Sequence, residues 1–355
     1  MALHYGLGED GKLIAASAAR LLADLSTPAA RRGFMRTQQF DAGWHAVLGG
    51  SGLLGICAPG PAGAGLGASD ALAVMLEAGC HVVPWPVAES IAGAALLARG
   101  HPMLAARIVQ GDAIVAFAPP GGVQAHSHAD GWRLSGDFDA VPWAPLAQWL
   151  VLEANFDGGA GLALVELSAP GVACQPRKGI DPCCPVGRVV LDGAMLGRAA
   201  RIGAPDPRVH ALRTLLACAE MLGAAQACLD LAVDYMKVRR QFGQEIGRFQ
   251  ALKHIAANDA LYLESMRLAI EYAAWAHDAQ APDADVALHT AKEYCSDQAR
   301  TVAEDAIQCH GGIGFTWDHD LHLYLRRILR LGASLGTASE HREAIASLLV
   351  DTVSR

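Results

Sequence analysis

The apolar positions of the chain follow two different periods, and the change between them divides the sequence into three parts. Up to about residue 104, apolar side chains recur three or four positions apart between connections rich in Gly and Pro, which is the pattern of amphipathic helices. The same helical period returns after Pro207 and continues to Leu349. We therefore predict helices at both ends of the chain, and the C-terminal ones have the apolar spacing of a helical bundle.

The middle section has a different pattern. Its apolar runs are short and are separated by Gly, Pro and Asp, which is typical of β-strands joined by turns. The predicted strands cover residues 114–117, 132–136, 149–152, 162–165 and 189–191. We predict an α+β fold that is mostly α, with an N-terminal helical domain (1–110), a middle β-domain (111–204) and a C-terminal four-helix bundle (205–355).

Composition excludes several functions. The chain has 355 residues, of which 52% are hydrophobic and 18% charged, as in a well-packed protein. A net charge of −8 argues against binding to nucleic acid. Charged or polar residues interrupt each apolar run before it reaches the length of a bilayer span, so we expect no membrane association. The start of the sequence has no apolar segment after a basic one, which predicts a cytoplasmic protein without a signal peptide.

Two groups of histidines have the residue type of metal ligands. His126-Ser127-His128 lies in an apparent loop and has no third ligand nearby in the sequence. His319 and His322 are three positions apart, but two arginines follow them and would repel a cation. We expect no metal site.

The stretch Gly60–Ala68 has glycines at the spacing of a dinucleotide-binding turn. Such a turn needs a strand before it and an acidic residue about twenty positions later. The apolar run before Gly60 is short, and no acidic residue stands at that distance at the end of a second strand. We interpret the stretch as a loop between helices.

The last third of the chain carries two motifs with chemical potential. The run RRQFGQEIGRFQ begins at Arg239, and the run AIQCHGGIGF contains Gln308 and the pair Gly311-Gly312. An Arg side chain can hold two phosphate oxygens at once, and a Gly-Gly turn exposes backbone N–H groups. Both turns therefore suit a pyrophosphate.

These two runs and the distance between them resemble acyl-CoA dehydrogenases. The resemblance covers nearly the whole chain and is strong from residue 206 onward. It implies that a flavin lies between the β-domain and the C-terminal bundle. In such enzymes a glutamate removes the α-proton of an acyl-CoA, and the β-hydride passes to the flavin.

The resemblance also implies which residues contact the flavin of a neighbouring subunit. These are Arg239, Gln241, Phe242, Gln250, Gln308, Gly311, Gly312 and Thr337. The competing interpretation is that both motifs are ordinary helix-ending turns in which Gly provides the cap. Retention of two such motifs at the separation found in the family favours the cofactor role.

Two other parts of the family pattern are missing. In the β-domain, the first flavin-contacting segment is reduced to Ala118–Gly122, and Pro142 stands where a Thr or Ser is expected. Proline offers neither a hydroxyl nor an N–H group. We therefore expect that this chain does not hold the flavin ring in its own β-domain.

The catalytic base is missing as well. Its usual position aligns with Leu335, and the alternative position used by some members aligns with Arg213. Leucine cannot accept a proton and arginine stays protonated, so we assign no catalytic residue. Glu220 lies on the same predicted helix as Arg213 and is a possible substitute, but a polar contact between helices is the favoured interpretation.

This combination implies the small subunit of a heteromeric, α2β2 acyl-CoA dehydrogenase, similar to bacterial enzymes that act on steroid side-chain CoA thioesters. A larger partner would hold the flavin ring and the glutamate, FAD would be shared, and electron-transfer flavoprotein would accept the electrons. The run HGGIGFTWDHDLHLYLRR also resembles that group. Two alternatives stay open: a homo-oligomeric flavoenzyme with a different base, and a non-catalytic scaffold of the same fold.

Overall fold

The computed structural model describes residues 9–353, which form two compact units. One unit holds residues 9–33, 67–83 and 211–353, and the other holds residues 34–66 and 84–210. The boundary near residue 33 falls inside helix α2 (Pro28–Thr37). Each unit therefore combines segments that are far apart in the sequence, and the division into three domains stays a prediction.

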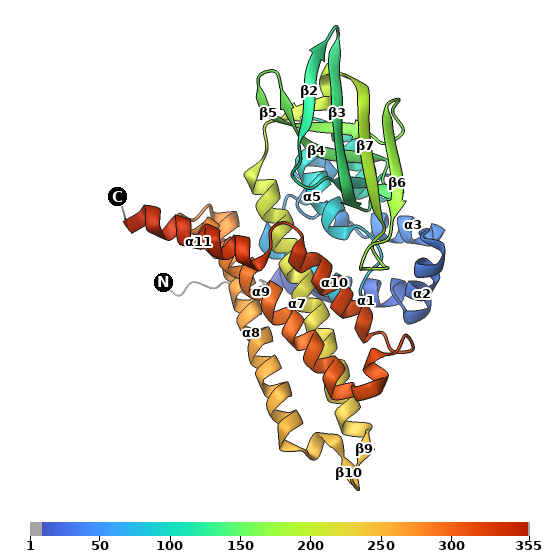
Figure 1. Cartoon of the computed structure of the whole chain (residues 1–355), viewed down its shortest axis with the longest axis vertical. Coiled ribbons are helices and arrows are strands. Elements are labelled where there is room, and N and C mark those ends of the chain that lie inside the picture. The colour runs from blue at the N-terminus through green and yellow to red at the C-terminus, as the bar shows by residue number, and fades with distance from the viewer. Residues whose placement is uncertain (1–8, 354–355) are drawn as a thin grey trace. The chain divides into compact units, whose positions relative to one another are not determined.

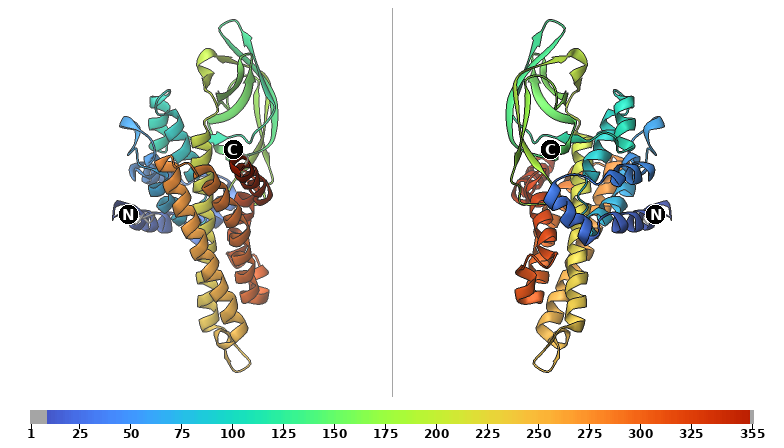
Figure 2. Two further views of the ribbon diagram at one scale, coloured as in Figure 1. Left: turned by 90° about the vertical axis from the view of Figure 1, so that its left-hand side faces the viewer. Right: turned by 90° about the vertical axis from the view of Figure 1, so that its right-hand side faces the viewer.

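The first unit is helical. Its α-helices include α1 (Glu9–Leu25), α4 (Ala68–Cys80), α7 (Pro207–Val238), α8 (Gln250–Ala279), α9 (Ala284–His310), α10 (Leu321–Ala333) and α11 (Ala338–Val353). Helix α9 packs against α8, α10 and α11, and α4 packs against α1 and α8. The short strands β9 (Arg240–Gln241) and β10 (Gln244–Glu245) form a hairpin that joins α7 to α8 (Figure 1). Both views of Figure 2 show this hairpin at the end of the helical pair where α7 stops and α8 begins.

Two glycines let α4 and α7 approach closely. A Cβ atom on Gly79 would lie 2.1 Å from the carbonyl oxygen of Glu220, and one on Gly223 would lie 1.8 Å from that of Leu76. A side chain at either position would overlap the backbone of the other helix, so only glycine fits. This contact brings an N-terminal helix into the C-terminal helical unit.

The second unit is built around a mixed sheet. Its helices are the end of α2 together with α3 (Ala42–Gly50), α5 (Val87–Leu97) and α6 (Pro102–Val109). The strands are β1 (Val115–Phe117), β2 (Val123–His128), β3 (Gly131–Pro142), β4 (Trp149–Phe156), β5 (Gly159–Glu166), β6 (Val172–Arg177), β7 (Val186–Gly197) and β8 (Arg201–Gly203). They are arranged in the order β6-β7-β3-β2-β4-β5-β8, with β1 also paired to β4.

Alternating residues of these strands form one apolar core. The core includes Val123, Ala125, Leu134, Phe138, Leu150, Leu152, Ala154, Ala163, Val165, Val189 and Leu191. Because successive side chains point to opposite faces of a strand, this set fixes the register of the sheet.

Five of these strands confirm the predicted apolar runs, whereas β2, β6 and β8 were not predicted. The interpretation of His126-Ser127-His128 as a loop was wrong, because these residues end strand β2. Only Val123 and Ala125 of β2 are buried, so the strand has too few apolar positions to show a period of two.

The predicted fold class is confirmed: the protein is 59% helical with a mixed sheet and has a C-terminal helical domain.

The expectation that no apolar run is long enough for a bilayer span does not hold for helix α7. This helix is long and apolar enough to cross a membrane by length and composition alone, but 72% of its most apolar window is buried inside the structure. That burial is what the core helix of a folded unit shows.

Candidate functional site

The Arg239–Gly243 turn runs from Arg239 at the base of the β9–β10 hairpin to Phe242 and Gly243 at its tip. Phe242 and Gly243 both have positive φ angles, 52° and 79°, as a two-residue hairpin turn requires. Arg240 stabilises the turn through two hydrogen bonds within the hairpin. Its Nη1 atom donates to Glu245 Oε1 at 2.6 Å, and its Nη2 atom donates to the carbonyl of Gly243 at 3.3 Å. The exposed guanidinium of Arg239 has no such partner among residues 9–353 and stays available to a ligand.

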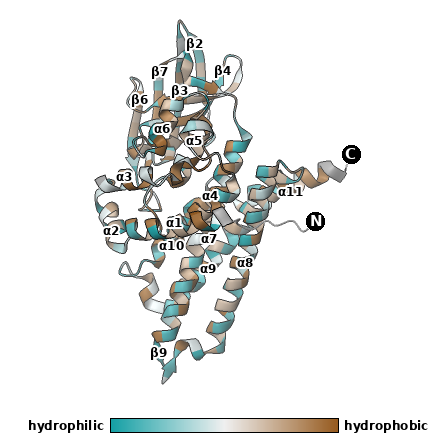
Figure 3. Cartoon of the chain, turned by 180° about the vertical axis from the view of Figure 1, so that it is seen from behind, coloured by the Kyte–Doolittle hydropathy of each residue, from teal (hydrophilic) through white to brown (hydrophobic). Residues whose placement is uncertain are grey.

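The same hairpin presents an aromatic ring to the solvent. Phe242 is 92% exposed, and its ring meets that of Phe249 edge-on with centroids 6.0 Å apart. Figure 3 shows hydrophilic residues over the rest of the hairpin. A phenyl ring that is almost fully exposed adds little to folding by burial, so its position favours contact with another molecule.

The second turn follows α9. Gln308 is exposed, and Gly311 ends the helix with φ 63° while its N–H group donates to the carbonyl of Gln308. Gly312 has no positive φ, and a Cβ atom on either glycine would meet nothing within 4 Å. The backbone conformation therefore explains why position 311 is a glycine, but it does not explain the glycine at position 312. Gly312 leaves open space beside the backbone, which suits the close approach of a ligand.

Two stacked rings join these turns. Tyr235 in the last turns of α7 and His310 at the end of α9 have ring centroids 4.4 Å apart and an interplanar angle of 19°. The Arg239 and Gly311 motifs therefore lie at the same end of the helical unit. The sequence does not indicate a role for either ring, because a Tyr or a His within a helical pattern fits both a buried and an exposed position.

The remaining predicted contacts, Gln250 and Thr337, begin helices. Gln250 is the exposed first residue of α8. Thr337 precedes α11, where Glu340 Oε2 accepts from its N–H group at 2.7 Å and its hydroxyl at 2.9 Å, and its Oγ1 accepts from the N–H group of Glu340. This reciprocal capping box explains a Thr at this position without a cofactor. The roles of both residues in binding stay predictions.

The two positions where a base is expected hold Leu335 and Arg213. Leu335 lies in the turn between α10 and α11 with φ 59°, and its carbonyl accepts from His341 Nε2 at 3.0 Å. Arg213 is half-buried on α7. Neither side chain provides a carboxylate.

A buried lysine lies beneath the Leu335 turn, but it does not replace the base. Lys292 is 0% exposed. Its Nζ atom is within 3.2 Å of Ser296 Oγ and of the carbonyls of Leu331, Gly332 and Gly336. Burial lowers the pKa of this ammonium, yet four oxygen acceptors surround it and favour the protonated form. Its role is to hold the turn in place.

Glu220 is not free to act as a base either. Its carboxylate pairs with Arg327 of α10, and both side chains are buried. Arg327 also donates to the carbonyl of Val83. The favoured interpretation of Glu220 as a polar contact between helices is confirmed.

The end of β3 does not fit a flavin ring. Pro142 has no donor, and the following Trp143 is 2% exposed with φ 66°. The N–H group of Trp143 donates to the carbonyl of Pro185 at 2.6 Å, and its ring packs with Phe34 and Cys184. The polar groups that a cofactor would need here are absent or already used.

The histidine groups give no cation site. His126 Nδ1 lies 3.4 Å from Asp157 Oδ1, and His319 accepts from the N–H group of Leu321. Within the part of the chain that the structure describes, no three His, Cys, Asp or Glu side chains are placed to hold a metal ion.

Comparison with known proteins gives the family. The profile of the acyl-CoA dehydrogenase C-terminal domain matches residues 210–349. The acyl-CoA dehydrogenase FadE27 of Mycobacterium tuberculosis is 31% identical over 338 residues, which cover 89% of this chain and 90% of FadE27. The chain belongs to the acyl-CoA dehydrogenase family. Membership of this family supports oxidoreductase activity and FAD as the cofactor.

The chain is also similar to a second acyl-CoA dehydrogenase and to a solved structure. FadE34 of Mycobacterium tuberculosis is 34% identical over 310 residues, but this chain spans only 42% of its length. A chain in the crystal structure of the ChsE4–ChsE5 complex from Mycobacterium tuberculosis matches with a TM-score of 0.92 and 29% identity, over 98% of this chain and 99% of that one.

Proposed function

We propose that this acyl-CoA dehydrogenase is the small, base-less subunit of a heteromeric enzyme that introduces an α,β double bond into an acyl-CoA thioester. One contrast carries the proposal. The exposed turns at Arg239 and Gly311 are suited to a cofactor, whereas Leu335 and Arg213 occupy the two positions of the base. Such a chain can complete a partner's flavin site but cannot run the reaction alone.

The residues of this chain would bind and orient FAD, which supplies the hydride-accepting chemistry when bound. Arg239 would hold pyrophosphate oxygens with its planar fork, and the N–H group of Gly312 would donate to the same anion. The amides of Gln241, Gln250 and Gln308 would add hydrogen bonds. The ring of Phe242 would pack on the adenine.

A larger acyl-CoA dehydrogenase subunit is the proposed partner, in an α2β2 heterotetramer. The match to a chain of the two-component ChsE4–ChsE5 complex supports a hetero-oligomer. We propose a bulky substrate such as a steroid side-chain CoA thioester, because loss of one of two neighbouring active sites would leave room for it. Electron-transfer flavoprotein is the proposed acceptor and the cytoplasm the proposed location.

The visible absorption spectrum tests the proposal directly. The chain purified alone is expected to be colourless, and the complex co-purified with a larger subunit is expected to be yellow. A yellow lone chain would contradict the interpretation that Pro142 prevents this chain from holding the flavin ring, and it would favour the homo-oligomeric flavoenzyme. A complex without dehydrogenase activity on any acyl-CoA would favour the scaffold.

A further inference from the structure

We propose that Tyr235 and His310 are positioning residues for the cofactor. Their stacked rings set the Arg239–Gly243 turn and the Gln308–Gly312 turn at the separation that lets a single FAD contact both. The inference rests on the proposed function, because it concerns how this chain completes a partner's flavin site.

Each ring is coupled to one turn through the backbone. The carbonyl of Tyr235 accepts from the N–H group of Arg239 at 2.9 Å, so the ring sits one helical turn before the motif. His310 directly precedes Gly311, and its Nδ1 atom donates to the carbonyl of Ala306 at 2.8 Å. A ring contact of 4.4 Å between them therefore ties the end of α7 to the end of α9.

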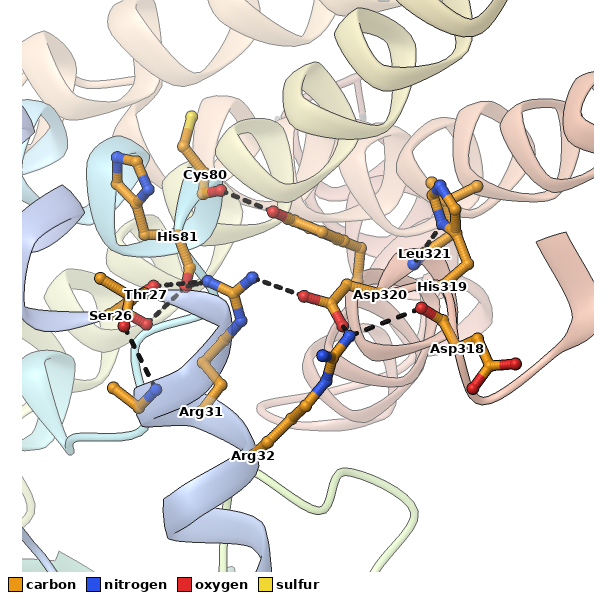
Figure 4. Close-up of polar contacts among 12 residues, drawn as sticks. Ser26, Thr27, Arg31, Arg32, Cys80, His81, Asp318, His319, Asp320 and Leu321 are labelled. Carbon is orange, nitrogen blue, oxygen red and sulfur yellow. Dashed lines mark hydrogen bonds and ion pairs between the residues drawn. The ribbon is translucent and has the colours of Figure 1, made fainter. Parts of the chain in front are cut away.

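His310 contacts a second aromatic ring as well. It is 5% exposed, and the His319 ring lies 4.6 Å from it. Next to His319, Asp320 accepts from Arg31 Nη2 at 2.8 Å, and the Arg31 side chain is itself buried (Figure 4). Because the loop before α10 is anchored to α2 in this way, the His310 ring cannot swing away from Tyr235 without breaking other contacts.

The hairpin keeps its internal shape by separate contacts. Glu245 pairs with Arg240 at 2.6 Å and with Arg248 at 2.9 Å, and the N–H group of Ile246 donates to the carbonyl of Arg239 at 2.8 Å. Removal of the stack should therefore leave the hairpin folded. What the stack determines is the place of the hairpin relative to Gly311.

That relative placement matters for a ligand held at two points. A guanidinium and a backbone N–H group at Gly312 act together on one pyrophosphate only if both reach it at once, and their joint effect is lost when the geometry is wrong. A change at Tyr235 or His310 would therefore weaken FAD binding while every group that touches FAD is still present.

The test is a FAD titration of the co-purified complex. Arg239→Ala, which removes a charge-assisted contact, is expected to weaken FAD binding about ten- to a hundredfold. Tyr235→Ala and His310→Ala are each expected to weaken it about two- to tenfold, the range of one aromatic pair. Tyr235→Phe keeps the ring and should bind as the unchanged protein does. His310→Leu fills the space without an aromatic face and serves if the Ala variant does not fold.

A double variant separates positioning from general destabilisation. If the stack acts by placing Arg239, then Tyr235→Ala combined with Arg239→Ala should bind FAD little worse than Arg239→Ala alone. Met266→Ala removes a fully buried side chain of α8 that belongs to neither turn, so it should lower stability without changing FAD affinity. The inference would be overturned if the double variant lost FAD affinity by the product of the two single-variant factors. It would also be overturned if FAD affinity were unchanged in both Tyr235→Ala and His310→Ala.

Amide hydrogen exchange on the lone chain tests the stack without the partner. Tyr235→Ala should speed exchange at Arg239, whose N–H group donates to the carbonyl of Tyr235, and at residues 308–313, and leave α11 unchanged. Unchanged exchange in both segments would also count against the inference. Unchanged FAD affinity in Arg239→Ala would instead refute the proposed function, so the two failures can be told apart.

Discussion

The Asp259 carboxyl lies inside the helical unit with 2% exposure, at the one polar position in the apolar stripe of α8. Burial, the charge of Asp305 on α9 and a hydrogen bond between the two carboxyls raise its pKa to about 7. Burial also raises the pKa of Asp305. The two carboxyls therefore share a proton near neutral pH, because two adjacent buried charges repel.

This pair predicts a pH-dependent stability. Between the ordinary Asp value of 3.8 and about 7, the folded state keeps a proton that the unfolded state releases. The free energy of unfolding should therefore fall as the pH rises through this window. Asp259→Asn cannot ionise and should show a flatter profile, with higher stability than the unchanged protein at about pH 8. Urea unfolding from about pH 5 to pH 8 measures both slopes, with exposed Asp192→Asn as the control. Equal slopes for Asp259→Asn and the unchanged protein would exclude the shared proton.

Thr337 caps helix α11, and the family resemblance also predicts that it contacts the cofactor. Thr337→Ala removes the side-chain half of the capping box and is expected to lower stability by about 0.5–2 kcal/mol, measured by chemical unfolding. Thr337→Ser keeps the hydroxyl and should restore it. The same variants, titrated with FAD in the complex, decide the predicted cofactor role. Unchanged FAD affinity in Thr337→Ala would leave capping as its whole function.

At the scale of elements, the crossing of α4 and α7 depends on two glycines. Their spacing is invisible to a helical pattern, in which Gly counts only as a weak helix former. The structure gives them a reason, since the backbones of the two helices fill the space that a side chain would need.

Gly223→Ala tests this contact. The added methyl group would lie 1.8 Å from the carbonyl oxygen of Leu76, so the helices must separate, and the expected loss is about 1–3 kcal/mol. Gly33→Ala in α2 meets nothing within 4 Å and should be neutral or slightly stabilising. Thermal unfolding of both variants measures the difference. A Gly223→Ala protein as stable as Gly33→Ala would show that the helices can move apart at little cost.

The elements also show where sequence patterns fail. Strands β4 and β5 were predicted because four or more consecutive residues of each are apolar. Strand β2 was missed, since its exposed face carries Gln124 and His126, and its pairing with β3 and β4 is a property of the sheet. The same holds for the site: both turns were predicted from their motifs, whereas the Tyr235–His310 stack was not.

At the scale of the whole molecule, the main consequence concerns the number of flavins. We propose that the end of β3, at Pro142 and Trp143, does not hold a flavin ring, and we therefore expect one FAD for each pair of large and small subunits. Native mass spectrometry gives the subunit ratio, and flavin absorbance against amino-acid analysis gives the FAD content. One FAD for every chain would contradict the proposal and point to a complete site in this subunit.

The sequence by itself determined the family, the mostly helical fold, the two turns that we propose contact the flavin, and the absence of a carboxylate at Leu335 and Arg213. These features are local, because periodicity and motifs depend on residues close together along the chain. The tertiary structure alone decided the pairing of Glu220 with Arg327, the elevated pKa of Asp259 and the stack that joins the two turns. Each of those depends on helices that meet only after folding, where burial and neighbouring charges change what a side chain can do.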